Sequence, residues 1–93
     1  MIKSFADKAT EAIHQGKFVK GIPANVLERA LRKLQQLAAA GDLRDLAIPP
    51  GNQLEHLLGD RAGWHSIRVN QQWRLCFRWE DGHAHDVKIV DYH

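Results

Sequence analysis

The sequence predicts a single α+β domain, with helices in its first half and an antiparallel sheet in its last third. Apolar residues recur every three or four positions up to about residue 40, which is the spacing of amphipathic helices. From residue 64 onward apolar and polar residues alternate instead, as they do in half-buried strands. Ninety-three residues allow one hydrophobic core and no second domain, so we expect the domain to span residues 1–93.

Two helices are predicted before residue 42. Ser4 is the expected N-cap of the first helix, with Asp7 three residues later, and Gly16 is its expected end. Pro23 suits the first position of the second helix, which Gly41 ends. The second helix has a continuous apolar stripe formed by Val26, Leu27, Ala30, Leu31, Leu34, Leu37 and Ala38.

The segment between the helices and the sheet is less regular. Residues 49–52, with the sequence Pro-Pro-Gly-Asn, cannot form the interior of a helix or a central strand. We therefore predict an extended surface connector, anchored by the leucines that precede it. Leu54, Leu57 and Leu58 fit either one helical turn or a short strand, and residues 59–63 are predicted to form a loop.

In the last third of the chain, apolar and polar residues differ in parity, that is, in whether their residue numbers are odd or even. Its strand-forming apolar residues are odd-numbered: Ile67, Val69, Leu75, Phe77, Trp79, Val87 and Ile89. For three consecutive antiparallel strands to share one apolar face, the connections between them must preserve this parity. A three-residue connection over 70–72 does so, and it sets Arg68 directly opposite Arg74.

The second connection of the sheet allows two readings. A two-residue Asp81–Gly82 turn would pair odd with even positions and set Asp86 opposite Phe77. We prefer a three-residue loop, Glu80–Gly82, with Gly82 left-handed, because it keeps the register.

The position of the basic residues is more informative than their sum. The net charge of +2 is too small to indicate nucleic-acid binding. The predicted strands and the loop before them, however, contain Arg61, Arg68, Arg74, Arg78 and Lys88. We interpret the lysines and arginines of the N-terminal half as ordinary solvated surface charges.

Arg68 and Arg74 are the candidate anion-binding residues. Like charges opposite one another destabilise a sheet unless an anion sits between them. A guanidinium donates two parallel hydrogen bonds and stays charged at any working pH, which suits phosphate. The alternative is ordinary ion pairing of each arginine with Asp60 or Asp86. Trp64 has the same even parity and suits stacking on a base.

Tyr92 and His93 extend the polar face of the third predicted strand. Histidine titrates near neutrality and can move a proton, and a tyrosine can stack on a base or donate through its hydroxyl. The alternative is that Tyr92 covers the edge of the core and that His93 has no role.

The remaining residues argue against several other classes of protein, namely metalloproteins, cofactor-dependent enzymes and membrane proteins. His83 and His85 have no third histidine or cysteine at metal-ligand spacing, and no glycine-rich phosphate loop is present, so we expect neither a metal nor a cofactor. The single cysteine, Cys76, fits a reducing compartment. No signal peptide or membrane-spanning stretch is recognisable, so a cytoplasmic protein without membrane contact is expected.

Several motifs together resemble the HigB toxins of the RelE/ParE superfamily. The motifs are Gly59-Asp60-Arg61-x-Gly63, Ser66-Ile67-Arg68-Val69-Asn70-x-x-Trp73-Arg74, Phe77-x-Trp79 and Asp91-Tyr92-His93, with Pro49-Pro50-Gly51-Asn52-x-Leu54-Glu55 and Met1-Ile2-x-Ser4-Phe5 before them. The resemblance implies two N-terminal helices packed on a small twisted antiparallel sheet. It also implies a toxin that cuts mRNA on the translating 70S ribosome and is held inactive by a helix-turn-helix antitoxin, HigA.

By matching positions, the resemblance gives active-site roles to Arg68, Arg74, Tyr92 and His93. One position departs from the family pattern. Some HigB proteins carry His-Pro-Leu-Lys before Gly-Asp, where this chain has Glu55-His56-Leu57-Leu58. The histidine is displaced by one position and the lysine is lost, so Glu55, His56 and His93 all stay open as the general base.

Two other functions stay open on the same fold. One is a non-catalytic inhibitor of DNA gyrase, as in the ParE branch of the superfamily. The other is a degenerate toxin that only binds its antitoxin or the ribosome, which the missing lysine makes plausible.

Overall fold

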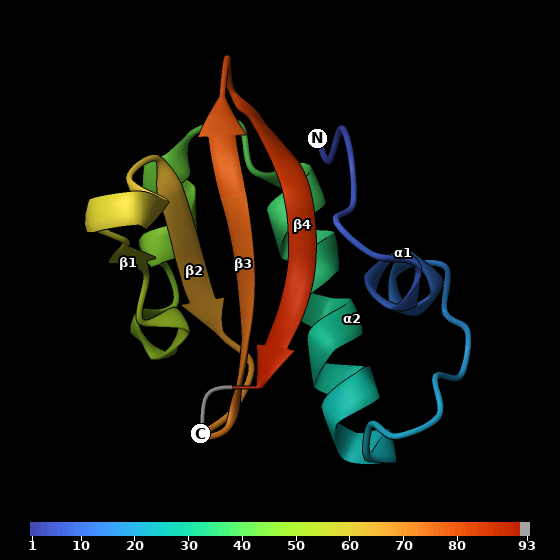
Figure 1. Cartoon of the computed structure of the whole chain (residues 1–93). Helices are drawn as coiled ribbons and strands as arrows, with labels where there is room; N and C mark the ends of the chain where they lie inside the picture. The colour runs from blue at the N-terminus through green and yellow to red at the C-terminus, as the bar shows by residue number, and fades with distance from the viewer. Residues whose placement is uncertain (92–93) are drawn as a thin grey trace.

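The computed structural model describes residues 1–91 and shows two helices packed on one face of a four-stranded antiparallel sheet (Figure 1). The helices are α1 (Lys8–His14) and α2 (Ala24–Ala39), and the strands are β1 (Glu55–His56), β2 (Trp64–Arg68), β3 (Trp73–Glu80) and β4 (His83–Asp91), in the sheet order β1-β2-β3-β4. This arrangement confirms the predicted α+β class. None of the described helices is long and apolar enough to cross a membrane.

The core lies between α2 and the sheet. The buried residues of α2 are Val26, Ala30, Leu34 and Leu37, all from the predicted stripe. They share one apolar cluster with the odd-numbered strand residues Ile67, Leu75, Phe77 and Val87. The helical spacing and the strand parity therefore both identified the core correctly.

The predicted cap of the first helix is wrong by three residues. α1 begins after Asp7, whose carboxylate accepts a hydrogen bond from the Thr10 backbone N–H at 2.7 Å. Ser4 instead accepts a hydrogen bond from the backbone N–H of Asp86 at 2.9 Å. The reason is tertiary, because Ile2 and Phe5 pair with β4 and hold this segment extended.

The predicted extended connector is also wrong. Residues Leu43–Ala47 and Pro50–Asn52 form two 3-10 helices. The fully buried Asn52 side chain donates hydrogen bonds to the carbonyl oxygens of Leu46 and Ile48, which draws this segment into a compact turn. Of the two alternatives after it, the short strand β1 is present, and one 3-10 turn at Gly59–Arg61 follows.

The connection between β2 and β3 is as predicted, with Arg68 opposite Arg74. The connection between β3 and β4 is not, because Glu80 pairs with His83 and leaves a two-residue Asp81–Gly82 turn with both residues left-handed. A bulge then restores the parity.

The bulge lies in the middle of the β3–β4 pair. Cys76 pairs with Lys88 but Arg78 pairs with His85, so β4 has one extra residue here. Asp86 takes up the change with a φ of 52°. Its carboxylate accepts a hydrogen bond from Arg78 at 2.8 Å and is therefore not buried against the core.

Candidate active site

The sheet face turned away from the helices holds a buried polar group. Arg74, Ser66 and Cys76 are even-numbered and point away from the core, yet they are only 6%, 0% and 1% exposed. Arg74 and Ser66 are covered because the segment before β1 reaches Arg74 at Gln53 and β1 pairs with the edge of β2. Local parity therefore placed them on the right face but did not predict their burial.

Among residues 1–91, four contacts hold Arg74. Its Nε donates to Ser66 Oγ at 2.9 Å, and one terminal nitrogen donates to the carbonyl oxygens of Ser66, at 3.3 Å, and of Gln53. The other terminal nitrogen lies 3.6 Å from a carboxylate oxygen of Glu55. A guanidinium fixed in this way is preorganised, because no side-chain freedom is lost when it meets a ligand.

Glu55 and His56 lie on opposite faces of the sheet, since neighbouring residues of a strand alternate. Glu55 pairs with Ser66 and is half exposed beside Arg74. His56 pairs with His65, and their Nδ1 atoms are 2.7 Å apart. The partial burial of His65, and then the nearby His56, lower the pKa of His65. Only Glu55 of the two candidate bases in β1 therefore adjoins Arg74.

Arg68 and Arg74 are direct strand partners but have different surroundings. Arg68 lines two cavities of about 260 and 400 Å³, and Arg29 of α2 lines both of them as well. Within residues 1–91, neither Asp60 nor Asp86 forms an ion pair with Arg68 or Arg74. Glu55 places a negative charge beside Arg74, which reduces the repulsion between the two arginines, and the anion expected between them stays a prediction.

The roles predicted for Tyr92 and His93 concern residues outside the described part of the chain. The last described residue, Asp91, lies opposite Trp73, directly beside the strand position of Arg74. Its carboxylate accepts a hydrogen bond from the Gln72 side chain at 3.1 Å.

A second cationic feature lies on the same sheet face. A cavity of about 160 Å³ is lined by Arg61, Trp64, Cys76 and Lys88. The Lys88 Nζ stands 5.3 Å from the centre of the Trp64 ring, which is a cation–π contact. The sequence analysis assigns no site role to Lys88, although its even position is sufficient to place it on this face.

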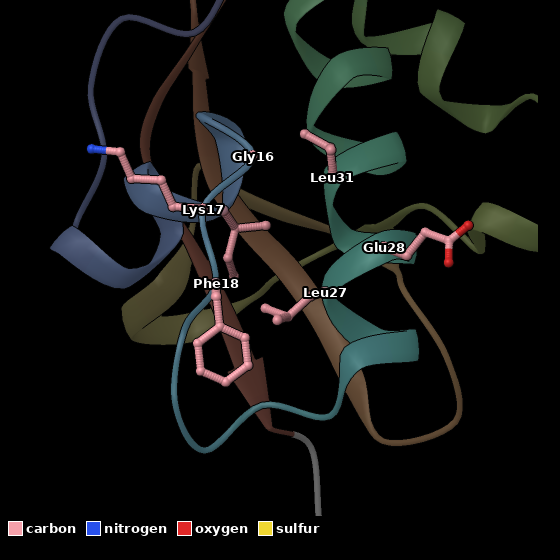
Figure 2. A pocket seen from close by; sticks show the side chains of 7 residues that line it. Gly16, Lys17, Phe18, Leu27, Glu28 and Leu31 are labelled. Atoms are coloured by element: carbon pink, nitrogen blue, oxygen red, sulfur yellow. The ribbon is translucent and has the colours of Figure 1, made fainter.

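The apolar hollow between the helices carries no comparable chemistry. It has a volume of about 270 Å³, and Phe18, Leu27 and Leu31 are among its lining residues (Figure 2). The charged ends of Lys17 and Glu28 point away from it (Figure 2). Across residues 1–91, no group of three or more histidine, cysteine or acidic side chains is placed to hold a metal ion.

Comparisons with known proteins agree with this fold. Over residues 3–93 the chain matches the family model of HigB-like toxins, described as RelE-like toxins of the type II toxin–antitoxin system HigB. It is 47% identical over 85 residues to Toxin HigB-1 of Vibrio cholerae serotype O1, covering 90% of each chain. It is 33% identical over 93 residues to Endoribonuclease HigB of Proteus vulgaris, covering all of both.

Solved structures show the same architecture at low sequence identity. A YoeB–YefM complex from Staphylococcus aureus matches with a TM-score of 0.63 and 18% identity, covering 100% of this chain and 98% of that one. YafQ from Escherichia coli matches with a TM-score of 0.56 and 16% identity, covering 98% and 91%. The fold is thus that of the small RelE-like toxins. The chain belongs to the HigB-like toxins of type II toxin–antitoxin systems, as its motifs predicted.

Proposed function

We propose that this toxin is an endoribonuclease that cuts mRNA on the 70S ribosome and so stops translation. One relative is named an endoribonuclease, and the family places the chain among type II toxins. The observation that carries the proposal is Arg74, a guanidinium held rigidly by Ser66 and Gln53 and adjoining the carboxylate of Glu55. A fixed cation beside a carboxylate is suited to phosphodiester chemistry.

The proposed reaction is a transesterification by the RNA's own 2′-hydroxyl. The 2′ oxygen bonds to the adjacent phosphorus and the P–O5′ bond breaks, which leaves a 2′,3′-cyclic phosphate and a 5′-hydroxyl. A base removes the 2′ proton, cations stabilise the charge on the phosphate oxygens, and an acid protonates O5′. The chemistry needs neither a metal nor a protein nucleophile.

The scheme assigns roles to five of the candidate residues. Arg74 and Arg68 stabilise the phosphate, His93 transfers a proton to the leaving oxygen, and Tyr92 stacks on or positions a nucleobase of the RNA. Glu55 is the general base. We prefer it to His56 because it shares a sheet face with Arg74, whereas His56 faces His65 on the other side.

The choice between the two bases is tested by a matched pair of variants. Glu55→Gln keeps the size and a hydrogen-bonding group but not the base, so cleavage of ribosome-bound mRNA should fall about 10²–10⁴-fold. His56→Gln should cut at close to the wild-type rate. If His56→Gln loses activity while Glu55→Gln retains it, the general base is His56, and the argument from the two sheet faces is wrong.

The activity itself is tested by inducing the toxin and mapping the 5′ ends of cellular RNA. New 5′-hydroxyl ends inside translated reading frames are expected. Intact mRNA with poisoned gyrase would decide for a ParE-like inhibitor, which the HigB-like family match does not favour. A variant without Tyr92 and His93 that still cuts would remove both residues from the mechanism.

We further propose that the antitoxin is a helix-turn-helix protein of the HigA type and that the toxin acts in the cytoplasm, where ribosomes translate. The solved complexes of the same fold contain a toxin with its antitoxin, which supports the pairing. Copurification with the product of the adjacent reading frame tests the antitoxin's class.

A further inference from the structure

A basic groove runs beside Arg68, between α2 and the β2–β3 connection. We define it by four cations, Arg29, Arg32 and Lys33 of α2 and Arg68 of β2. They line a cavity of about 260 Å³, and Arg29 and Arg68 also line a second one of about 400 Å³. Because Arg29 and Arg68 line both cavities, the two hollows are neighbours, and we refer to them together as the groove.

The second hollow is completed by amide side chains. Asn70, Gln71 and Gln72 of the β2–β3 connection line it. Asn70 Oδ1 accepts hydrogen bonds from the backbone N–H groups of Gln72 and Trp73, which fixes the shape of the connection. The exposed Gln71 lies at the tip of this connection and can donate to a ligand oxygen.

The charges of the groove are mostly uncompensated. Arg32 pairs with Glu28, but both side chains are about two-thirds exposed, so this pair is weak. Lys33 is held by Asn52, a neutral partner. Among the described residues, Arg29 and Arg68 form no ion pair. Four like charges around one hollow repel each other, and a bound anion would relieve that repulsion.

The lining indicates a polyanion rather than a protein surface. Val69 is the one large apolar side chain among the described residues that line the groove, and none of them is aromatic. Protein interfaces depend on apolar and aromatic anchors, whereas nucleic-acid interfaces are polar and strongly basic. The absence of aromatic rings from this lining indicates contact with phosphates and not stacking on bases.

We propose that this groove holds the phosphate backbone of single-stranded RNA, on the same strand that is cut at Arg74. The proposal rests on the ribonuclease function above. Arg68 joins the two regions, because it is the direct strand partner of Arg74 and also lines the groove. The groove therefore positions the RNA and contributes affinity that does not depend on base sequence.

The test measures binding of a fluorescent, 2′-O-methylated single-stranded RNA by anisotropy between 50 and 200 mM KCl. This probe has no free 2′-hydroxyl, so binding is read whether or not the chain cuts RNA. The variant is Arg29→Gln, since Arg29 is exposed and glutamine is a good helix former. Arg44→Gln is the matched control, with the same charge change on a side chain that is 90% exposed and outside the groove.

Loss of one phosphate contact should reduce the slope of log K against log[salt] by about 0.7 and weaken binding about fivefold at 0.1 M salt. Arg44→Gln should match the wild type. On ribosome-bound mRNA, Arg29→Gln should raise KM and leave kcat unchanged.

An Arg29→Gln slope equal to that of the wild type, or no salt-dependent binding by the wild type, overturns the groove. Weakened antitoxin binding with unchanged RNA binding also overturns it, and assigns the groove to an acidic protein. If the wild type binds the probe but never cuts mRNA, the ribonuclease proposal fails and the groove stands as an RNA-binding site without catalysis.

Discussion

Replacing Arg74 with alanine should reduce stability as well as activity, because its guanidinium is part of the folded interior. The substitution leaves the carbonyl oxygens of Ser66 and Gln53 and the Ser66 hydroxyl without this donor. Removing one partner of a buried charged group costs about 3–5 kcal/mol. Glu55 is 52% exposed and regains water, so we expect the lower end, about 3 kcal/mol.

A loss of this size can be measured because the variant should still be folded in the absence of denaturant. A chain of this length has a free energy of unfolding of roughly 5–14 kcal/mol. With a urea m-value near 1 kcal/mol/M, a loss of about 3 kcal/mol lowers the urea midpoint by about 3 M. Arg74→Lys keeps the charge but not the planar fork, so it should lose about half as much. Arg44→Ala, which removes an exposed arginine, should change the midpoint by less than about 0.5 M.

Cleavage of ribosome-bound mRNA must then be measured where each variant is fully folded. Under those conditions Arg74→Ala should cut about 10²–10³-fold more slowly, the usual cost of one electrostatic donor. A urea midpoint equal to that of Arg44→Ala would refute the internal anchoring. A folded Arg74→Ala protein that cuts at the wild-type rate would refute the catalytic assignment.

Two further predictions concern the supports around the site. The pKa of His65 is lowered by burial and by His56, so its protonation opposes folding, and the free energy of unfolding should fall as pH drops below about 6.5. In acid titrations of stability, His65→Asn should show a smaller fall, and an identical curve would exclude His65 as a source. Asn52→Ala leaves the buried Leu46 carbonyl without its donor, so urea unfolding should show a loss of about 1–3 kcal/mol. A loss under 0.5 kcal/mol would mean that water replaces the amide.

Periodicity predicted most of the fold, because it depends on burial of one face at a time. The stripe of α2 and the odd-numbered strand residues both pack where their spacing indicated. The errors came where hydrogen bonds of polar side chains override the local pattern. Ser4 lost its capping role because it pairs with β4, and Asn52 folds the expected connector by binding carbonyl groups of the same segment.

The register of β4 shows why local rules were insufficient. Parity favoured a three-residue loop, since a two-residue turn would place Asp86 against the core. The chain instead has the tight Asp81–Gly82 turn and corrects the register within β4, with a bulge at Asp86. The hydrogen bond from Arg78 stabilises the bulge, and this partner on the neighbouring strand is not visible in the alternation itself.

The sequence predicted which residues belong to the candidate site, but it did not predict which of them lie next to one another. Parity placed Arg68 and Arg74 opposite each other, and the structure confirms that register. It could not show that β1 brings Glu55 to Arg74 while it turns His56 to the other face, because a two-residue strand has no period to detect. Likewise, the helical spacing predicts exposed positions for the cations of α2 but does not predict that they line the groove beside Arg68.

The different surroundings of Arg68 and Arg74 suggest how this chain can act without the lysine that some HigB proteins carry before Gly59, where it has Leu58. Arg74 is fixed by protein groups and Glu55, so it is suited to one phosphate at one position. Arg68 has no ion-pair partner among the described residues and stands among other cations, so it is suited to a flexible strand. The positive charge that a lysine would supply at the exposed Leu58 is therefore supplied elsewhere on the surface, by the arginines of the groove. If this compensation holds, Leu58→Lys should raise cleavage more in the Arg29→Gln background than in the wild type, and equal effects in both would show that the two positions act independently.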